Sequence, residues 1–242
     1  LDLADLRDQL SEKTRLVSLV HISNTLGCCN PIEEIAALAH AVGAKVLVDA
    51  CQSLAHKSIA VQSLGADFLV GSSHKLCGPT GMGFLWASEQ TLMAMPPFLG
   101  GGEMIQEVFL DHSTWAELPH KFEAGTPAIG EAIGMGAAIT YLQTLGLDAI
   151  QAWEAELTIH LFGRLQSIDG LRILGPTPEQ QPDRGALATF VVEGVHANDI
   201  AAMLDLSGVC IRSGHHCCQP LHRLYGVTGS ARASLSFCTT HA

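Results

Sequence analysis

The sequence has few charged residues, and positive side chains are the scarcer sign. Charged residues make up 15% of the 242 positions, with 13 Lys and Arg against 24 Asp and Glu, so the net charge is −11. A protein this acidic lacks the positive surface that binds nucleic acid or an anionic membrane. Because 48% of the residues are hydrophobic, the composition also excludes disorder and indicates a globular protein with a real core.

Long apolar runs are missing as well. No stretch approaches the ~20 apolar residues that a membrane helix needs, and residues 1–7 form an acidic helical pattern unlike a secretory or transit signal. We therefore expect a cytoplasmic protein that binds neither a membrane nor nucleic acid.

Cysteine spacings typical of metal sites and disulfide frameworks are absent. None of the eight cysteines belongs to a Cys-x-x-Cys pair, and two pairs are directly adjacent, Cys28–Cys29 and Cys217–Cys218. This pattern suits neither a zinc site nor a set of disulfides, so we predict no metal. We expect reduced thiols, most of them small core residues.

What is present is an alternation of helical and extended patterns in the first half. The pattern predicts helices over 2–13, 31–43 and around 60–64, and strands over 16–22, 45–49, 67–71 and 83–86. Continuous apolar strands separated by helices predict an α/β fold whose largely parallel sheet is covered on both faces.

The second half begins with helices and changes to an α+β pattern. Residues 95–127 look irregular, and a stretch that long is usually functional. The pattern beyond it predicts helices over 129–145, 148–168 and 198–206, and strands over 171–174, 186–192, 209–212 and 232–237. We place a domain boundary near residue 145, which gives domains 1–145 and 146–242.

Polar side chains follow two of the predicted strands. Lys75 ends the tetrapeptide after strand 67–71, and Asp49 ends strand 45–49. An amine and a carboxylate at the carboxyl ends of buried strands suit a pyridoxal phosphate (PLP) site, where the lysine forms a Schiff base and the aspartate keeps the pyridine nitrogen protonated. A surface lysine in a turn and a capping aspartate are the alternatives.

Neighbouring residues support the PLP interpretation. Ser72 and His74 offer donors for a phosphate, and Gln52 could bond the phenolic oxygen of the cofactor. Asn24 also lies at a strand end, where ligands of open α/β sheets gather. A nucleotide-binding loop is excluded because Lys75 precedes the glycines that follow it.

A second group of candidate residues is the run from Arg212 to Cys218. Four consecutive side chains, 215–218, cannot easily converge on one tetrahedral metal ion. A cysteine nucleophile fits better, because a nearby arginine or histidine favours the thiolate. Arg232, among small and apolar residues, suits a clamp on a substrate carboxylate. A solvated loop and a surface arginine remain the alternatives.

With these stretches assembled, the chain resembles the class V aminotransferase-like cysteine desulfurases. It is most similar to the Suf-type (group II) branch, with selenocysteine lyases as near relatives. The matching stretches occur in family order at 23–27, 48–52, 72–81, 100–105, 122–127, 212–217 and 232–235. The resemblance implies a PLP-dependent transferase of fold type I, with a partial large domain followed by a small α+β domain.

The resemblance also implies roles for the candidate residues. Lys75 would carry the cofactor, Asp49 would pair with the pyridine nitrogen and Gln52 with the phenolic oxygen. Ser72 and His74 would bind the phosphate, and Thr126 would reach the phosphate of the partner subunit in a homodimer. Asn24 and Arg232 would hold the substrate carboxylate, with Arg212 nearby.

In this interpretation Cys217 would attack the sulfur of the cysteine–PLP adduct, release alanine and keep a persulfide. The sulfur would pass to a Suf-type acceptor protein for iron–sulfur cluster assembly. Two alternatives stay open: a selenocysteine lyase or cysteine-sulfinate desulfinase, and a catalytically silent module for dimerisation or partner binding.

The chain departs from the family in three places. An upstream phosphate-binding turn and a histidine that stacks on the cofactor are absent, and so is a closing helix after His241. We therefore interpret the chain as a fragment, the second half of the cofactor domain plus most of the small domain. Cys218 stands where the family usually has a small residue, which adds a second thiol beside Cys217.

Overall fold

The computed structural model describes residues 1–241, and their contacts divide them into two compact units. The first unit contains the segments Leu1–Leu19, Ile32–Cys51 and Ile59–Thr144. The second contains Val20–Pro31, Gln52–Ser58 and the chain from Leu145 onward. The expected division into domains 1–145 and 146–242 stays a prediction.

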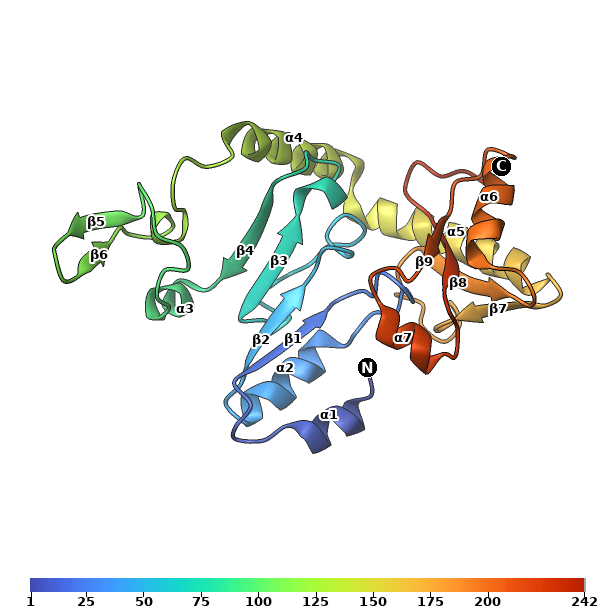
Figure 1. The fold of residues 1–242 in the computed structure, drawn as a ribbon, viewed down its shortest axis with the longest axis horizontal. Coiled ribbons are helices and arrows are strands. Elements are labelled where there is room, and N and C mark those ends of the chain that lie inside the picture. Colours follow the sequence, from blue (N-terminus) through green and yellow to red (C-terminus); the bar gives the residue numbers. More distant parts are fainter. Residues whose placement is uncertain (242) are drawn as a thin grey trace. The chain divides into compact units, whose positions relative to one another are not determined.

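The first unit is built on a four-stranded sheet, as the alternating pattern predicts (Figure 1). In spatial order its strands are β1 (Leu16–Val20), β2 (Lys45–Asp49), β3 (Phe68–Ser72) and β4 (Gly83–Ala87). Strands β2 and β3 run parallel, whereas β4 returns antiparallel to β3. Its helices are α1 (Leu3–Gln9), α2 (Ile32–Ala41), α3 (Glu89–Ala94) and α4 (Ile129–Leu145).

Helix α2 forms where local signals favour it and covers part of the sheet. Pro31 precedes its first residue, and Glu33 and Glu34 lie in its first turn at the positive end of the helix dipole. Its buried side chains recur at helical spacing and are Ile32, Ile35, Ala36 and Ala39. They form the core of the unit together with the fully buried Val46 and Val48 of β2.

The sheet of the first unit is not covered on both faces by the residues that the structure describes. Leu16 of β1 is 50% exposed and Leu85 of β4 is 49% exposed. Both belong to edge strands. The expectation of a fully covered sheet is therefore wrong for residues 1–241.

Two short segments differ from their predicted structure. Residues 60–64 form turns rather than a helix, because the Ser63 hydroxyl bonds the same carbonyl of Ala60 as the Ser63 amide does. The stretch 95–127 contains a hairpin of β5 (Ile105–Val108) and β6 (Ser113–Trp115) instead of being wholly irregular. Its strands are short and mostly exposed, so no burial pattern marks them in the sequence.

The second unit holds a four-stranded antiparallel sheet and three helices. In spatial order its strands are β7 (Leu171–Leu174), β8 (Leu187–Val192), β10 (Ser230–Ser234) and β9 (Arg212–Gly214). The helices are α5 (Leu147–Gln166), α6 (Ala197–Asp205) and α7 (Gln219–Leu224). Strands β9 and β10 are displaced by about two residues from the predicted 209–212 and 232–237, and α7 was not predicted.

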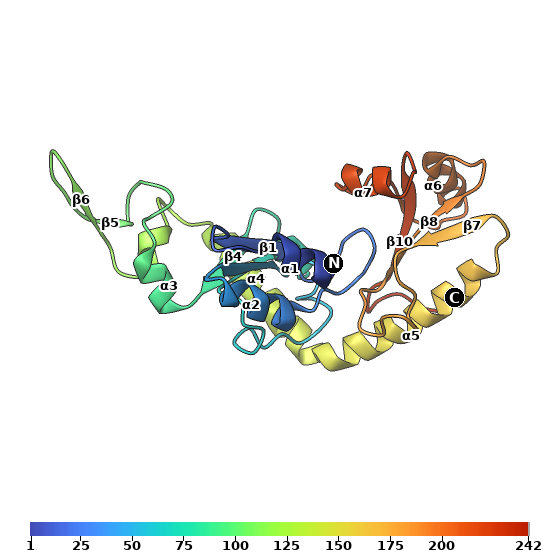
Figure 2. The same ribbon diagram turned by 90° about the horizontal axis from the view of Figure 1, so that it is seen from below.

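The two faces of this sheet present different residues. Alternate residues of a strand point to opposite faces, and Phe190 of β8 and Ala231 of β10 face the core with Phe162 of α5, which runs along β7 and β8 (Figure 2). Thr189 and Arg232 form the next pair in register and so point to the other face. Helix α5 therefore covers one face of the sheet, and Arg232 points to the other.

Within residues 1–241, no helix combines the length and the apolar character needed to cross a membrane.

Candidate functional site

Lys75 lies on a tight turn at the end of strand β3. Residues Ser73–Lys75 form one turn of 3₁₀ helix, with Ser73 buried and Lys75 exposed. The Ser72 hydroxyl and His74 Nδ1 are 2.9 Å apart and hydrogen-bonded. Gly78 lets the chain close on this turn, since a Cβ there would lie 2.3 Å from Ser73 Oγ. The turn fixes Lys75 and the two predicted phosphate ligands at one edge of the sheet.

Asp49 reaches the same edge on the neighbouring strand. It pairs with Val70 in the parallel register of β2 and β3, so both strands deliver their carboxyl ends together. The Cys51 amide donates to Asp49 Oδ1 at 2.9 Å. Burial raises the pKa of the Cys51 thiol to about 11, with Asp49 adding to the rise and Lys75 opposing it. The structure therefore brings the predicted Asp49 and Lys75 around Cys51.

The other predicted cofactor ligands lie in different segments. Thr126 is exposed and follows Gly125, whose φ of 79° makes a left-handed turn. Gln52 is half-buried and begins the segment Gln52–Ser58 of the second unit. Their contacts with a cofactor stay predictions.

Asn24 and Arg232, the predicted carboxylate ligands, are neighbours in the second unit. Arg232 Nη1 donates to the Asn24 carbonyl at 2.7 Å. The Asn24 amide in turn donates to the carbonyl of His216 at 2.8 Å. One asparagine thus connects the arginine to the loop that carries Cys217.

Arg212 lies directly opposite Arg232 in the antiparallel pair of β9 and β10. Burial lowers the pKa of Arg232, the charge of Arg212 lowers it further, and Cys217 opposes the change. Two like charges in cross-strand register repel each other. An anion placed between them relieves that repulsion, so the pair suits a substrate carboxylate.

The loop that presents Cys217 has an unusual backbone. His216 has a φ of 50° and Cys217 a φ of 63°, both in the left-handed region. Such conformations cost about 1–3 kcal/mol per residue outside glycine and persist only where surrounding contacts hold them. Cys217 is exposed, whereas His216 is 2% exposed. The buried His216 therefore holds the loop in place, and the exposed thiol of Cys217 lies next to it.

The contacts that hold His216 involve residues that the sequence did not reveal. His216 Nε2 lies 3.1 Å from both the carbonyl and the hydroxyl of Ser230, and His222 Nε2 lies 2.8 Å from that hydroxyl. Burial lowers the pKa of His216 to about 4, assisted by the charge of Arg232. Adjacent histidines in a loop gave no signal for this network, because Ser230 lies on β10, 14 positions from His216, and only the pairing of β10 with β9 brings the two together.

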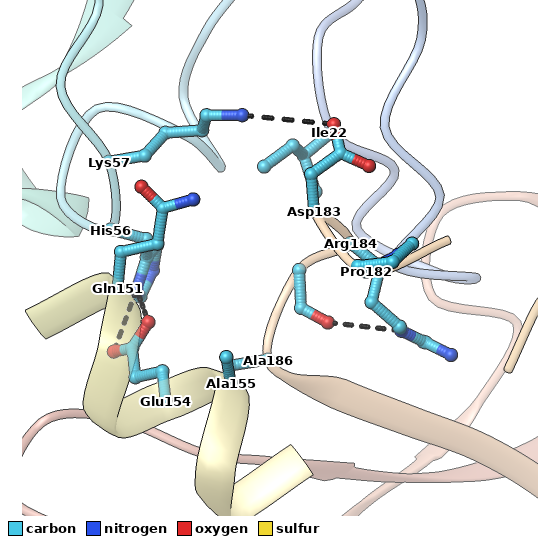
Figure 3. A pocket seen from close by; sticks show the side chains of 11 residues that line it. Ile22, His56, Lys57, Gln151, Glu154, Ala155, Pro182, Asp183, Arg184 and Ala186 are labelled. Carbon is cyan, nitrogen blue, oxygen red and sulfur yellow. Dashed lines mark hydrogen bonds and ion pairs between the residues drawn. The ribbon is translucent and has the colours of Figure 1, made fainter. Parts of the chain in front are cut away.

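A half-buried histidine pairs with a buried glutamate elsewhere in this unit. His56 Nδ1 contacts both carboxylate oxygens of Glu154, at 2.9 and 2.8 Å (Figure 3). The hollow beside them, also lined by Lys57 and Asp183, has a volume of about 20 Å³. That volume has room for a water molecule and not for an organic substrate, so this hollow is not the substrate site.

The cysteines differ from expectation in their burial. All eight are free thiols, but only Cys29 is buried, while Cys77, Cys210, Cys217 and Cys238 are exposed. The expectation that most are core residues is therefore wrong, because these four lie in turns and at strand ends. Among residues 1–241, no cluster of His, Cys, Asp and Glu side chains is arranged to bind a metal ion.

Comparison with known proteins shows which family and which solved structures this chain is similar to. Residues 1–242 match the family described as aminotransferase class-V. A probable cysteine desulfurase of Synechocystis sp. is 61% identical over 239 residues, 99% of this chain and 57% of that relative. The crystal structure of the cysteine desulfurase CsdA from Escherichia coli matches with a TM-score of 0.92 and 36% identity, covering 99% of this chain and 58% of that one.

A PLP-linked structure of the protein C-DES matches with a TM-score of 0.82 and 25% identity, over 98% of this chain and 60% of that one. These matches confirm the expected α/β fold of the fold type I PLP-dependent transferases and the resemblance to cysteine desulfurases. The chain spans less than two thirds of the length of these proteins. The Suf-type assignment stays a prediction.

Proposed function

Because this chain belongs to the class-V aminotransferase family, we propose that the whole protein is a PLP-dependent cysteine desulfurase. It converts L-cysteine to L-alanine and retains the sulfur as a persulfide on Cys217. The observation that carries this proposal is the exposed Cys217, on a strained and anchored loop next to Arg232. Relatives at up to 61% identity that bear the desulfurase name support it.

The residues of the first unit fit a bound PLP. Lys75 offers an exposed amine and Asp49 a half-buried carboxylate, and both influence the thiol of Cys51 between them. Ser72 and His74 offer a hydroxyl and an imidazole on the same turn. An amine for the aldehyde, a carboxylate for the pyridine nitrogen and polar donors for the phosphate are the groups that PLP requires.

When bound, PLP supplies an electron sink that stabilises negative charge on the substrate carbon. The chain's own residues do the rest. Arg232 and Asn24 hold the substrate carboxylate, and the paired charge of Arg212 and Arg232 favours its binding. The Cys217 thiolate attacks the substrate sulfur, so a sulfur–sulfur bond forms and the carbon–sulfur bond breaks. The carbon keeps that electron pair, takes up a proton and becomes the methyl group of alanine.

The proposed protein is a cytoplasmic homodimer that passes sulfur to a Suf-type acceptor for iron–sulfur cluster assembly. In the dimer, Thr126 contacts the phosphate in the partner subunit's site. Apolar side chains on helix α4 support a further contact surface, since Ile133 is 71% exposed and Tyr141 is 50% exposed. Selenocysteine lyase or cysteine-sulfinate desulfinase activity at the same residues is the alternative chemistry.

A second candidate applies to the 242-residue chain alone, because it spans 57% of its Synechocystis relative. In that case the chain is a silent module for dimerisation or partner binding. Titration with PLP separates the two. We expect the yellow absorbance of lysine-bound PLP to develop in the chain and to be lost in Lys75→Ala. A chain without that absorbance is the silent module.

The assignment of Cys217 has its own test. We expect alanine release from L-cysteine to collapse by about 10²-fold or more in Cys217→Ala, because no other thiol replaces the nucleophile. Cys218→Ala should retain most of the activity. The opposite pattern, measured in protein loaded with PLP, would assign the nucleophile to Cys218 instead.

A further inference from the structure

Two adjacent thiols stand in the loop that the proposed function uses. Cys217 and Cys218 have the same side-chain chemistry, so geometry has to decide which one reacts. Cys217 is exposed, whereas Cys218 is half-buried at the N-cap position of helix α7. The contacts that hold the loop in this conformation therefore determine which thiol reacts.

The hydrogen bonds beside Cys218 have a defined direction. His222 lies one turn along α7, and its Nδ1 is 2.9 Å from the Cys218 carbonyl. A carbonyl only accepts, so this nitrogen donates its proton, and in the neutral ring with that proton Nε2 of His222 is an acceptor. The Ser230 hydroxyl, 2.8 Å from that Nε2, therefore donates its hydrogen to it.

The same logic applies on the other side of Cys217. His216 Nε2 contacts the Ser230 carbonyl, so it carries the proton and also donates to the Ser230 hydroxyl. The ring is neutral at neutral pH, since burial lowers the pKa of His216 to about 4. One continuous path of hydrogen bonds thus runs from His216 through Ser230 and His222 to the Cys218 carbonyl.

This path begins and ends on the two residues that flank Cys217. The backbone between them is held further by Asn24, which donates to the His216 carbonyl, and by the Cys218 amide, which donates to the His215 carbonyl at 2.8 Å. These bonds fix the left-handed conformations of His216 and Cys217. We expect that without them the loop would relax to ordinary backbone angles and change which thiol faces solvent.

We propose that Ser230 is a positioning residue that selects Cys217 over Cys218 as the sulfur-accepting thiol, by bridging His216 and His222. The proposal rests on the proposed function only in taking the accepted group to be sulfur. The exposure of the two thiols follows from the loop itself. It can therefore be tested without PLP and without a substrate.

The experiment compares the alkylation of two neighbouring cysteines in one peptide. The chain is treated briefly with limiting iodoacetamide, and fragment-ion mass spectrometry gives the ratio of label on Cys217 to label on Cys218. We expect a ratio of about ten or more in the parent chain, because the exposed thiol is the accessible one. In Ser230→Ala, which removes both side-chain bonds, the ratio should fall about fivefold or more.

A matched control separates this role from general destabilisation. Ser53 is equally buried, lies in the same unit and is bonded to His21 at 3.0 Å. Ser53→Ala should leave the labelling ratio unchanged. An unchanged ratio in Ser230→Ala, or an equal fall in Ser53→Ala, overturns the proposal.

A second variant and a second measurement cover the case in which Ser230→Ala does not fold. His222→Phe keeps a flat aromatic ring, though a larger one, and removes both bonds, and it should lower the ratio in the same way. Hydrogen exchange in the folded variant should speed up at residues 215–219 and stay unchanged in Leu187–Val192 of β8. Equal acceleration in both segments would show a loss of stability and reject positioning. Absence of alanine release from the PLP-loaded parent chain, together with the expected fall of the labelling ratio in Ser230→Ala, would reject the proposed function and leave this proposal standing.

Discussion

Glu154 is 3% exposed, and its carboxylate has both oxygens on the imidazole of His56. Two residues further along α5, Glu156 makes a similar bond to His241 at 3.0 Å, but its side chain is 63% exposed. The two pairs have the same chemistry and differ in burial. An ion pair in water contributes little to stability. Removing one partner of a buried pair, by contrast, leaves the other group buried without an opposite charge beside it.

We expect Glu154→Gln to lower the free energy of unfolding by about 1–3 kcal/mol, because the amide cannot replace the charge opposite His56. Glu156→Gln should change it by less than about 0.5 kcal/mol. Urea unfolding followed by circular dichroism measures both. Equal effects at the two positions would mean that burial does not govern these pairs.

At the scale of the elements, Asp67 joins α2, β2 and the start of β3. Its carboxylate accepts from Lys45 Nζ at 2.6 Å, from His40 Nε2 at 2.9 Å and from the Val46 amide at 2.8 Å. Burial raises the pKa of Asp67, but these three hydrogen bonds lower it more, so the net change is downward. The charged carboxylate is thus the form that stabilises the packing of these elements.

Asp67→Asn should lower the free energy of unfolding at pH 7 by about 1–3 kcal/mol, because the bonds to charged partners are lost. A carboxyl with a depressed pKa stabilises the fold above its unfolded value of 3.8, and this contribution is lost as the pH falls below it. The difference between parent and variant should therefore shrink below pH 3.8. Asp111→Asn, on the hairpin with an 87% exposed side chain, is the control and should have no effect.

At the scale of the whole molecule, two buried histidines make the stability of the fold sensitive to acid. Burial lowers the pKa of His21 to about 4, with Lys57 adding to the change and Asp183 opposing it. Burial likewise lowers the pKa of His216 to about 4. Both side chains have an ordinary pKa of 6.5 when unfolded, so the unfolded chain binds more protons between pH 6.5 and 4.

The stability of the chain should therefore fall as the pH drops from 6.5 toward 4, by up to about 3 kcal/mol for each histidine. His21→Gln should remove roughly half of that slope, since it deletes one of the two groups. His112→Gln, on the exposed hairpin, should leave the slope unchanged. Urea midpoints at pH 7, 6, 5 and 4.5 measure the effect, and a flat profile in the parent chain would contradict it.

The sequence by itself determined the order of elements and the positions of Asp49 and Lys75 at strand ends. These features are local, because apolar runs, caps and glycines act within a few residues of the chain. Local patterns did not predict the structure of short or exposed segments correctly. Examples are the hairpin of β5 and β6 and residues 60–64.

Tertiary structure alone decided which residues meet in the second unit. Asn24 meets His216 across 192 positions, and His56 meets Glu154 across 98. Ser230 joins His216 and His222 only because the register of β8, β9 and β10 places it on the same face as Arg232, where His222 of helix α7 reaches it. Burial then shifts the pKa of His216 and leaves Cys217 exposed while Cys218 is withdrawn. Long-range register and burial are properties of the packed chain, and no local pattern of residues encodes them.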